Sequence, residues 1–284
     1  MLACCKTYRA VLAVLLALTV IGSVATIGGA FAQEEPTAGD EIPTQERTYL
    51  RVIHASPDAP SVDVYVENES VLENVSFSTV SDYLTLAAGS YNVTITAAGD
   101  REAEVFNGTL TLDARSINTV IATGEVSALG TNESTAFAPK VFEDDAYTPA
   151  ENESALSVIH LSPDAPAVDV TTTVNNTTIV LADNVSFGNG TEYLTVPAGN
   201  YTVDIRAASD DNNGTVVTSV DVTLESGVAY SALAVGYLDP DSATGDAPFE
   251  VLLIEDATVT VVLPGEEPSD DDGEVPEDPD SPAS

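Results

Sequence analysis

Two short segments of this sequence carry the residue types that nucleophilic catalysis and metal binding use. The first runs from Ile53 to Val64, and the second repeats it almost letter for letter from Ile159 to Val170. The chain's only two histidines stand at the same place in the two copies. Three interpretations must be weighed: a hydrolase site, a metal site and a structural turn. The shared polar residues are His54, Ser56, Asp58, Asp63, His160, Ser162, Asp164 and Asp169.

A serine hydrolase needs a base beside the serine hydroxyl and an acid that orients this base. In this sequence Ser56 directly precedes Pro57, so that residues 56–59 fit a type I turn with proline at its second position. The chain also lacks a Gly-x-Ser-x-Gly nucleophile elbow. The spacing therefore disfavours catalysis, and we predict a protein that is not an enzyme. An extracellular hydrolase or a glycan-processing enzyme is the alternative.

A metal site is the second interpretation of the repeated segment. One histidine per copy, without a His-x-x-x-His spacing or a neighbouring cysteine pair, does not make a zinc site. Calcium takes six to eight oxygen ligands, and Asp58, Asp63 and nearby carbonyls supply part of such a set. Weak calcium binding by a surface module therefore stays open. We assign no catalytic, cofactor-binding or metal-binding residue and expect no cofactor.

A structural role is the interpretation that we predict for these residues in both copies. His54 continues an apolar row and would end a core strand, with its ring nitrogens bonded to the turn. Asp58 would accept backbone N–H bonds that close the arch between two strands. Arg51 is placed to pair with Asp63, but Ser157 replaces that arginine in the second copy. An ion pair is therefore not the shared purpose of the motif.

The sequence pattern predicts that the elements which position the motif are short β-strands. Apolar residues alternate with polar ones, as in Val62, Val64 and Val66, and no stretch of module one has helical periodicity. We predict an all-β chain of two tandem antiparallel β-sandwich modules, Ig-like or transthyretin-like. The predicted segments are a signal peptide (1–32), a flexible acidic lead-in (33–48), module one (49–145), a linker (146–154), module two (155–262) and a disordered acidic, proline-rich tail (263–284).

A second repeated pattern strengthens the duplication. It reads Tyr-Leu-x-Leu-x-Ala-Gly-x-Tyr-x-Val from Tyr83, and from Tyr193 it recurs with valine in place of the second leucine. Together with the His-x-Ser-Pro-Asp-Ala-Pro-x-Val-Asp-Val motif, it resembles the family known as domain of unknown function 4397. The resemblance covers most of the mature chain as two copies. It implies an exported β-rich module and supplies neither an activity nor site residues.

The charge of the chain constrains its environment and its partners. The net charge is −38, and Lys6 and Lys140 are the only lysines among 284 residues. Such self-repulsion weakens a compact state at low salt, whereas at about 1 M salt the screening length falls to roughly 3 Å. The pattern resembles acidic, lysine-poor halophilic proteins. It disfavours binding to nucleic acid or to an anionic membrane.

The N-terminal segment predicts export. Lys6 and Arg9 precede an apolar run over residues 10–27, and Ala30-Phe31-Ala32 fits a cleavage site before Gln33. Both cysteines lie upstream of this site and would leave with the peptide. We expect an extracellular or cell-surface protein. An uncleaved N-terminal anchor is the alternative, because the apolar run is long for a signal peptide.

Asn-x-Ser/Thr triplets are frequent in this chain. On an exported protein they mark N-glycosylation sites, although a sequence rich in Ser, Thr and Asn also generates them by chance. We interpret the chain as an exported, salt-adapted, non-enzymatic interaction or adhesion protein, whose partner is a cell-envelope protein or a glycan. The triplets begin at Asn68, Asn74, Asn92, Asn107, Asn132, Asn152, Asn175, Asn176, Asn184, Asn189, Asn200 and Asn213.

Overall fold

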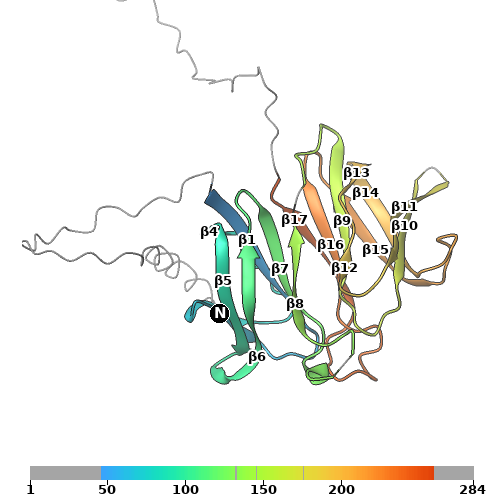
Figure 1. Ribbon diagram of the computed structural model, residues 1–284. Coiled ribbons are helices and arrows are strands. Elements are labelled where there is room, and N and C mark those ends of the chain that lie inside the picture. The colour runs from blue at the N-terminus through green and yellow to red at the C-terminus, as the bar shows by residue number, and fades with distance from the viewer. Residues whose placement is uncertain (1–45, 132, 145, 175, 259–284) are drawn as a thin grey trace, which may run out of the picture.

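The computed structural model describes residues 46–131, 133–144, 146–174 and 176–258 (Figure 1). In this part the chain forms β-strands and a short 3₁₀ helix, η3 (Val126–Ala128), which confirms the predicted all-β class. The predicted signal peptide, most of the lead-in and the predicted tail lie outside the described residues. No helix in the described ranges is long and apolar enough to cross a membrane.

Module one folds into two four-stranded sheets. Its inner sheet has the order β4-β1-β7-β8 and its outer sheet the order β3-β2-β5-β6. Neighbouring strands are antiparallel except for β1 and β7, which run parallel because the chain visits the other sheet between them. The strands are β1 (Arg47–Ala55), β2 (Val62–Val66), β3 (Glu69–Val75), β4 (Leu84–Ala87), β5 (Gly89–Ala97), β6 (Asp100–Leu112), β7 (Ile117–Thr123) and β8 (Ala138–Glu143).

Module two repeats this plan. Its inner sheet has the order β12-β9-β16-β17, with β13 also paired to β9, and its outer sheet has the order β11-β10-β14-β15. Here β9 and β16 form the parallel pair. The strands are β9 (Glu153–His160), β10 (Val168–Val174), β11 (Thr177–Val185), β12 (Asn189–Gly190), β13 (Leu194–Pro197), β14 (Gly199–Ala207), β15 (Val216–Leu224), β16 (Ala229–Val235) and β17 (Glu250–Asp256).

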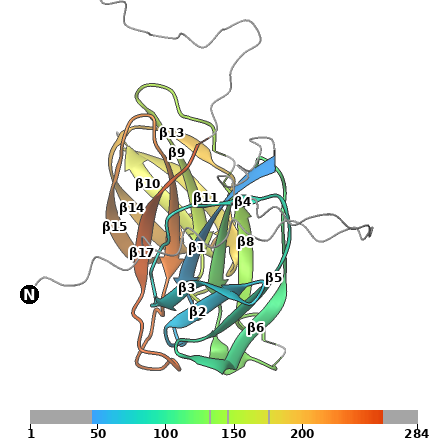
Figure 2. The same ribbon diagram turned by 90° about the vertical axis from the view of Figure 1, so that its left-hand side faces the viewer.

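The two modules lie side by side, with their inner sheets facing each other (Figures 1 and 2). One apolar cluster fills the space between the two sheets of module one, and a corresponding cluster fills module two. A third cluster joins the inner sheets, and its side chains come from both modules. The sheets therefore stack in four layers: outer, inner, inner, outer.

The central inner strands β1, β7, β9 and β16 are largely buried on both faces, which explains why apolar residues stand at successive positions in them, as at Val120 and Ile121. In β1, Leu50 and His54 point into the sandwich of module one, while Ile53 points between the modules. Ile53 and Leu233 of module two are both fully buried in the shared cluster. The modules thus share a core in addition to their own.

Candidate functional site

Each histidine of the repeated motif is buried, with both of its ring nitrogens bonded to backbone. The Ser56 amide donates to Nδ1 of His54 (3.3 Å), so the ring proton must sit on Nε2, which faces the carbonyl oxygen of Pro60 at 3.1 Å. His160 makes the same two contacts in module two, with Ser162 and Pro166. Burial lowers the pKa of both imidazoles below its ordinary value, so both rings are held neutral.

The serine hydroxyl of the motif is bonded to a carbonyl and not to the histidine. Ser56 Oγ donates to the carbonyl oxygen of Gly124 at 2.5 Å, and Ser162 Oγ donates to that of Gly236 at 2.7 Å. Both glycines follow the strand that runs parallel to the motif strand. The hydroxyl thus fastens the end of that strand to the motif. A weaker second contact joins it to the carboxylate of the motif, at 3.4 Å from Ser56 to Asp58 and at 3.2 Å from Ser162 to Asp164, and neither hydroxyl is bonded to a histidine.

The first aspartate of the motif holds the loop that follows. Asp58 accepts the backbone N–H groups of Val126 and Ser127, one at each carboxylate oxygen and both at 2.8 Å. In module two, Asp164 accepts the N–H groups of Leu238 and Asp239 in the same way, at 2.9 Å. A carboxylate that bridges two consecutive amides closes the arch between strands.

The second aspartate holds two turns of the outer sheet. Asp63 accepts the N–H groups of Asn74 (2.7 Å) and Gly99 (2.9 Å). Asp169 does the same with Asn184 (2.9 Å) and Ser209 (2.8 Å). Asn74 and Asn184 have positive φ, at 53° and 49°, and each lies in β3 or β11 where the register shifts. The aspartate therefore fixes a bulge in the same place in each module.

Arg51 does not pair with Asp63, and its ion pairs are with Asp256 and Asp144. Successive side chains of a strand point to opposite faces, so Arg51 shares the face of Ile53 and points toward module two. Its Nη2 atom lies 2.6 Å from Oδ1 of Asp256 and 3.5 Å from Oδ2 of Asp144. The arginine is 3% exposed and also donates to the carbonyl oxygen of Glu255. It joins the two modules through a buried ion pair.

A tyrosine supports each of these two buried carboxylates. Tyr83 donates to Asp144 and Tyr193 donates to Asp256, both at 2.8 Å. Burial is the main cause that raises the pKa of Asp144 to about 6, and the nearby Asp256 carboxylate raises it further. Burial also raises the pKa of both tyrosines. The Arg51 guanidinium lies over the ring of Tyr83, 4.7 Å from its centre.

A second contact between the modules joins equivalent positions of the two copies. Tyr237 and Glu125 each follow the glycine after the parallel strand, and the Tyr237 hydroxyl donates to Oε1 of Glu125 at 2.9 Å. Burial, together with Glu125, Asp58 and Asp164, raises the pKa of Tyr237. The two motif turns therefore converge on this tyrosine. Contact between equivalent positions is what an approximate two-fold relation between modules produces.

The network around Arg51 was missed by the sequence reasoning, although its signal was present. The Tyr-Leu pairs that start at Tyr83 and Tyr193, and the Glu-Asp pairs that end at Asp144 and Asp256, recur in both copies. Within the described ranges, no group of three or more His, Cys, Asp or Glu side chains is placed to hold a metal ion.

The glycosylation triplets lie on the surface wherever the structure describes them. Ten of the twelve asparagines fall in described positions, and all ten are exposed; Asn132 and Asn175 lie outside the described residues. Backbone conformation accounts for several of them, because asparagine tolerates positive φ better than most residues. The triplet asparagines with positive φ are Asn68, Asn74, Asn152, Asn176 and Asn184.

The fold and the repeated turns define a class: a protein of two tandem β-sandwich modules, each closed by a His-Ser-Asp motif whose histidine and serine are buried. The family described as "Domain of unknown function (DUF4397)" matches residues 48–171 and again residues 169–266. The chain belongs to this family, and it contains two copies of the domain. No curated protein matches the sequence.

Three solved structures share some similarity with this chain. The carbohydrate-binding module CBMbc (family CBM26) of Eubacterium rectale Amy13K, solved with maltoheptaose, is 13% identical, covers 74% of this chain and 97% of its own, and has a TM-score of 0.24. An α-glucan-binding streptococcal virulence factor is 13% identical, with 69% and 95% covered and a TM-score of 0.22. The fimbrial anchor protein Mfa2 of Porphyromonas gingivalis is 11% identical, with 73% and 97% covered and a TM-score of 0.18. Such low scores support no functional argument.

Proposed function

We propose that this protein is an exported, salt-adapted and non-enzymatic interaction protein of the cell envelope or the extracellular space. One observation carries the proposal: the polar groups of the repeated motif bind the protein's own backbone in both modules. The histidine nitrogens, the serine hydroxyl and the carboxylate oxygens are all engaged in this way. Serine catalysis needs a base at the hydroxyl, and a carbonyl occupies that position here. The motif supports the scaffold, and the outer surfaces bind the partner.

The same proposal covers the segments around the two modules. We propose that residues 1–32 direct export and are removed, and that modules spanning residues 49–145 and 155–262 act together outside the cell. The exposed asparagines support glycosylation on the outer surfaces. The mass of the protein isolated from its native source tests both points. A mass that includes residues 1–32 favours the membrane-anchored alternative.

Salt adaptation follows from the charge of the chain. At −38, self-repulsion is strong when the screening length is about 10 Å, near 0.1 M salt, and is nearly absent at molar salt. The melting temperature should therefore rise across that range. A melting temperature that does not change with salt would show that bound cations or other groups already neutralise the surface.

The decisive experiment measures binding of residues 33–284 to native cell envelopes at molar salt. We expect saturable binding that is lost after the envelopes are treated with protease or with periodate, which separates a protein partner from a glycan partner. No saturable binding to intact envelopes contradicts the proposal. So does hydrolysis of ester or glycosidic substrates that disappears in a Ser56→Ala, Ser162→Ala double variant, because this would assign the motif to catalysis.

A further inference from the structure

An apolar cavity of about 110 Å³ lies between the two sheets of module one. All eight strands of this module contribute to its wall, so the cavity occupies the centre of the sandwich. Valine is the commonest lining residue, and its short side chain fills less of the roughly 10 Å between packed sheets than leucine or phenylalanine does. The cavity therefore results from the many valines on the inner faces of the two sheets.

The wall is almost entirely apolar, and its polar side chains are Thr109, Tyr91 and His54. The Tyr91 hydroxyl, at one end, donates to the carbonyl oxygen of Ala87 at 2.7 Å. Both ring nitrogens of His54 are bonded to backbone. Apolar cavities of this kind stay dry, and one of about 150 Å³ admits benzene or xenon. The smaller volume here suits an aliphatic chain, which is narrower than an aromatic ring.

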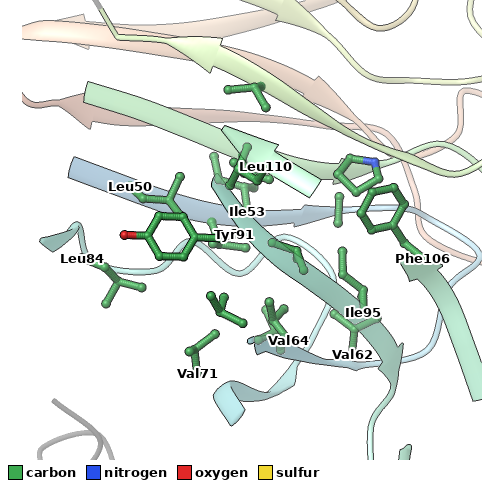
Figure 3. A pocket seen from close by; sticks show the side chains of 18 of the residues that line it. Leu50, Ile53, Val62, Val64, Val71, Leu84, Tyr91, Ile95, Phe106 and Leu110 are labelled. Atoms are coloured by element: carbon green, nitrogen blue, oxygen red, sulfur yellow. The ribbon is translucent and has the colours of Figure 1, made fainter. Parts of the chain in front are cut away.

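The cavity is not fully enclosed. In Figure 3, Leu84 and Tyr91 lie at one end, while Phe106 and Val62 lie at the other. Several wall residues are only partly buried, and Val141 on the edge strand β8 is 49% exposed. A chain can therefore enter from the side while its head group stays in water. With a net charge of −38, the protein repels an anionic head group.

We propose that module one binds the terminal segment of an aliphatic chain whose head group is uncharged or cationic. This site goes beyond the proposed interaction function and does not depend on it, since the cavity lies between the sheets and not on the outer surface. A negative result for envelope binding would not contradict this site, and a negative result for this site would not contradict envelope binding.

The direct test uses 1-decanol and protein labelled with ¹³C at its leucine and valine methyl groups. We expect saturable shifts, together with nuclear Overhauser effects from the terminal methyl of decanol to Leu50, Val64 and Val93. n-Pentane, which has no head group, should compete for the same methyl groups. The proposal is overturned if decanol gives no saturable shifts, if the effects come from its CH₂OH end, or if pentane binds and decanol does not.

A matched pair of variants provides a second test. Ala122 lines the cavity and pairs with His54 in the sheet, and Ala234 pairs with His160 at the equivalent place in module two. Ala122→Leu fills part of the cavity and should weaken decanol binding by about tenfold or more. Ala234→Leu should leave it unchanged. Equal effects of both variants, or no effect of Ala122→Leu in a folded protein, contradict the site. If Ala122→Leu does not fold, the nuclear Overhauser effects between decanol and the unmodified chain test the site by themselves.

Discussion

The repeated motif and the interface between the modules differ in how far the two copies agree. In the motif, His54 and Asp58 have identical counterparts that make the same contacts inside module two. At the interface, Arg51 faces module two whereas Ser157 stands at its place in the other copy. The motif that folds each module is identical in the two copies, whereas two polar contacts between the modules depend on residues that differ from their counterparts, Arg51 and Tyr237.

The residues that differ between the two copies also prevent repulsion between equivalent positions at the interface. An exact two-fold pairing of module one with itself would bring Glu125 against Glu125, and like charges in contact repel. Replacing one of them with Tyr237 turns that contact into a hydrogen bond. One arginine likewise serves the two equivalent carboxylates of Asp144 and Asp256. The asymmetry favours pairing of module one with module two.

Replacing Arg51 by serine, the residue at the equivalent place in module two, should cause the largest loss of unfolding free energy. Arg51→Ser gives module one the residue of module two and leaves two buried carboxylates without a cation, which costs about 3–5 kcal/mol of unfolding free energy. Denaturant titration at molar salt measures the loss. Arg206→Ser is the matched control, because its partner Asp204 is partly exposed; we expect 1 kcal/mol or less there, on the order of a surface pair. Similar losses in both variants would contradict the role of the buried network.

Breaking the motif should lower the free energy of unfolding by a smaller amount in both copies. Asp58→Ala and Asp164→Ala each remove the acceptor of two backbone N–H groups, which costs about 1–3 kcal/mol. Thermal melts of each single variant of the whole chain measure this. Unchanged stability, combined with loss of stoichiometric calcium binding in calorimetric titration, would assign the motif to metal binding.

Removing the charge of Asp144 should change the free energy of unfolding in a pH-dependent way. The folded-state pKa of about 6 lies above the ordinary 3.8, so protonation favours the folded state. The stability that this carboxyl contributes is present below pH 3.8 and is lost as the pH rises through about 6. Asp144→Asn should therefore gain stability relative to the unmodified chain at pH 7, and the difference should disappear near pH 4. Melts over this pH series measure the difference, and one that does not vary with pH contradicts the assignment.

Removing the hydrogen bond between Tyr237 and Glu125 should have the smallest effect on the free energy of unfolding. Tyr237→Phe removes a single bond to Glu125 and should cost about 0.5–1.5 kcal/mol. A double-mutant cycle with Glu125→Gln isolates the coupling between the two side chains. Additive losses would show that the two residues do not act as a pair.

The sequence predicts the strands and their inward rows because alternation along a strand is a local property. It also leads to the contacts of His54 and Asp58, since proline on either side of Asp58 limits that turn to few conformations. It does not predict the pairing of Arg51 with Asp256, because that contact depends on how two complete sandwiches pack. Alternation does place Arg51 on the face opposite His54. The sequence does not show, however, that this face of β1 packs against module two, because that depends on the three-dimensional arrangement of the modules.

The central claim is that the two modules form one cooperative unit through their shared core and the buried network of Arg51. Differential scanning calorimetry of the whole chain at molar salt tests it most directly. We predict one transition in which the calorimetric and van't Hoff enthalpies agree, as for a single two-state domain. Two separate transitions, or a calorimetric enthalpy about twice the van't Hoff value, would show that the modules unfold independently and would contradict the account.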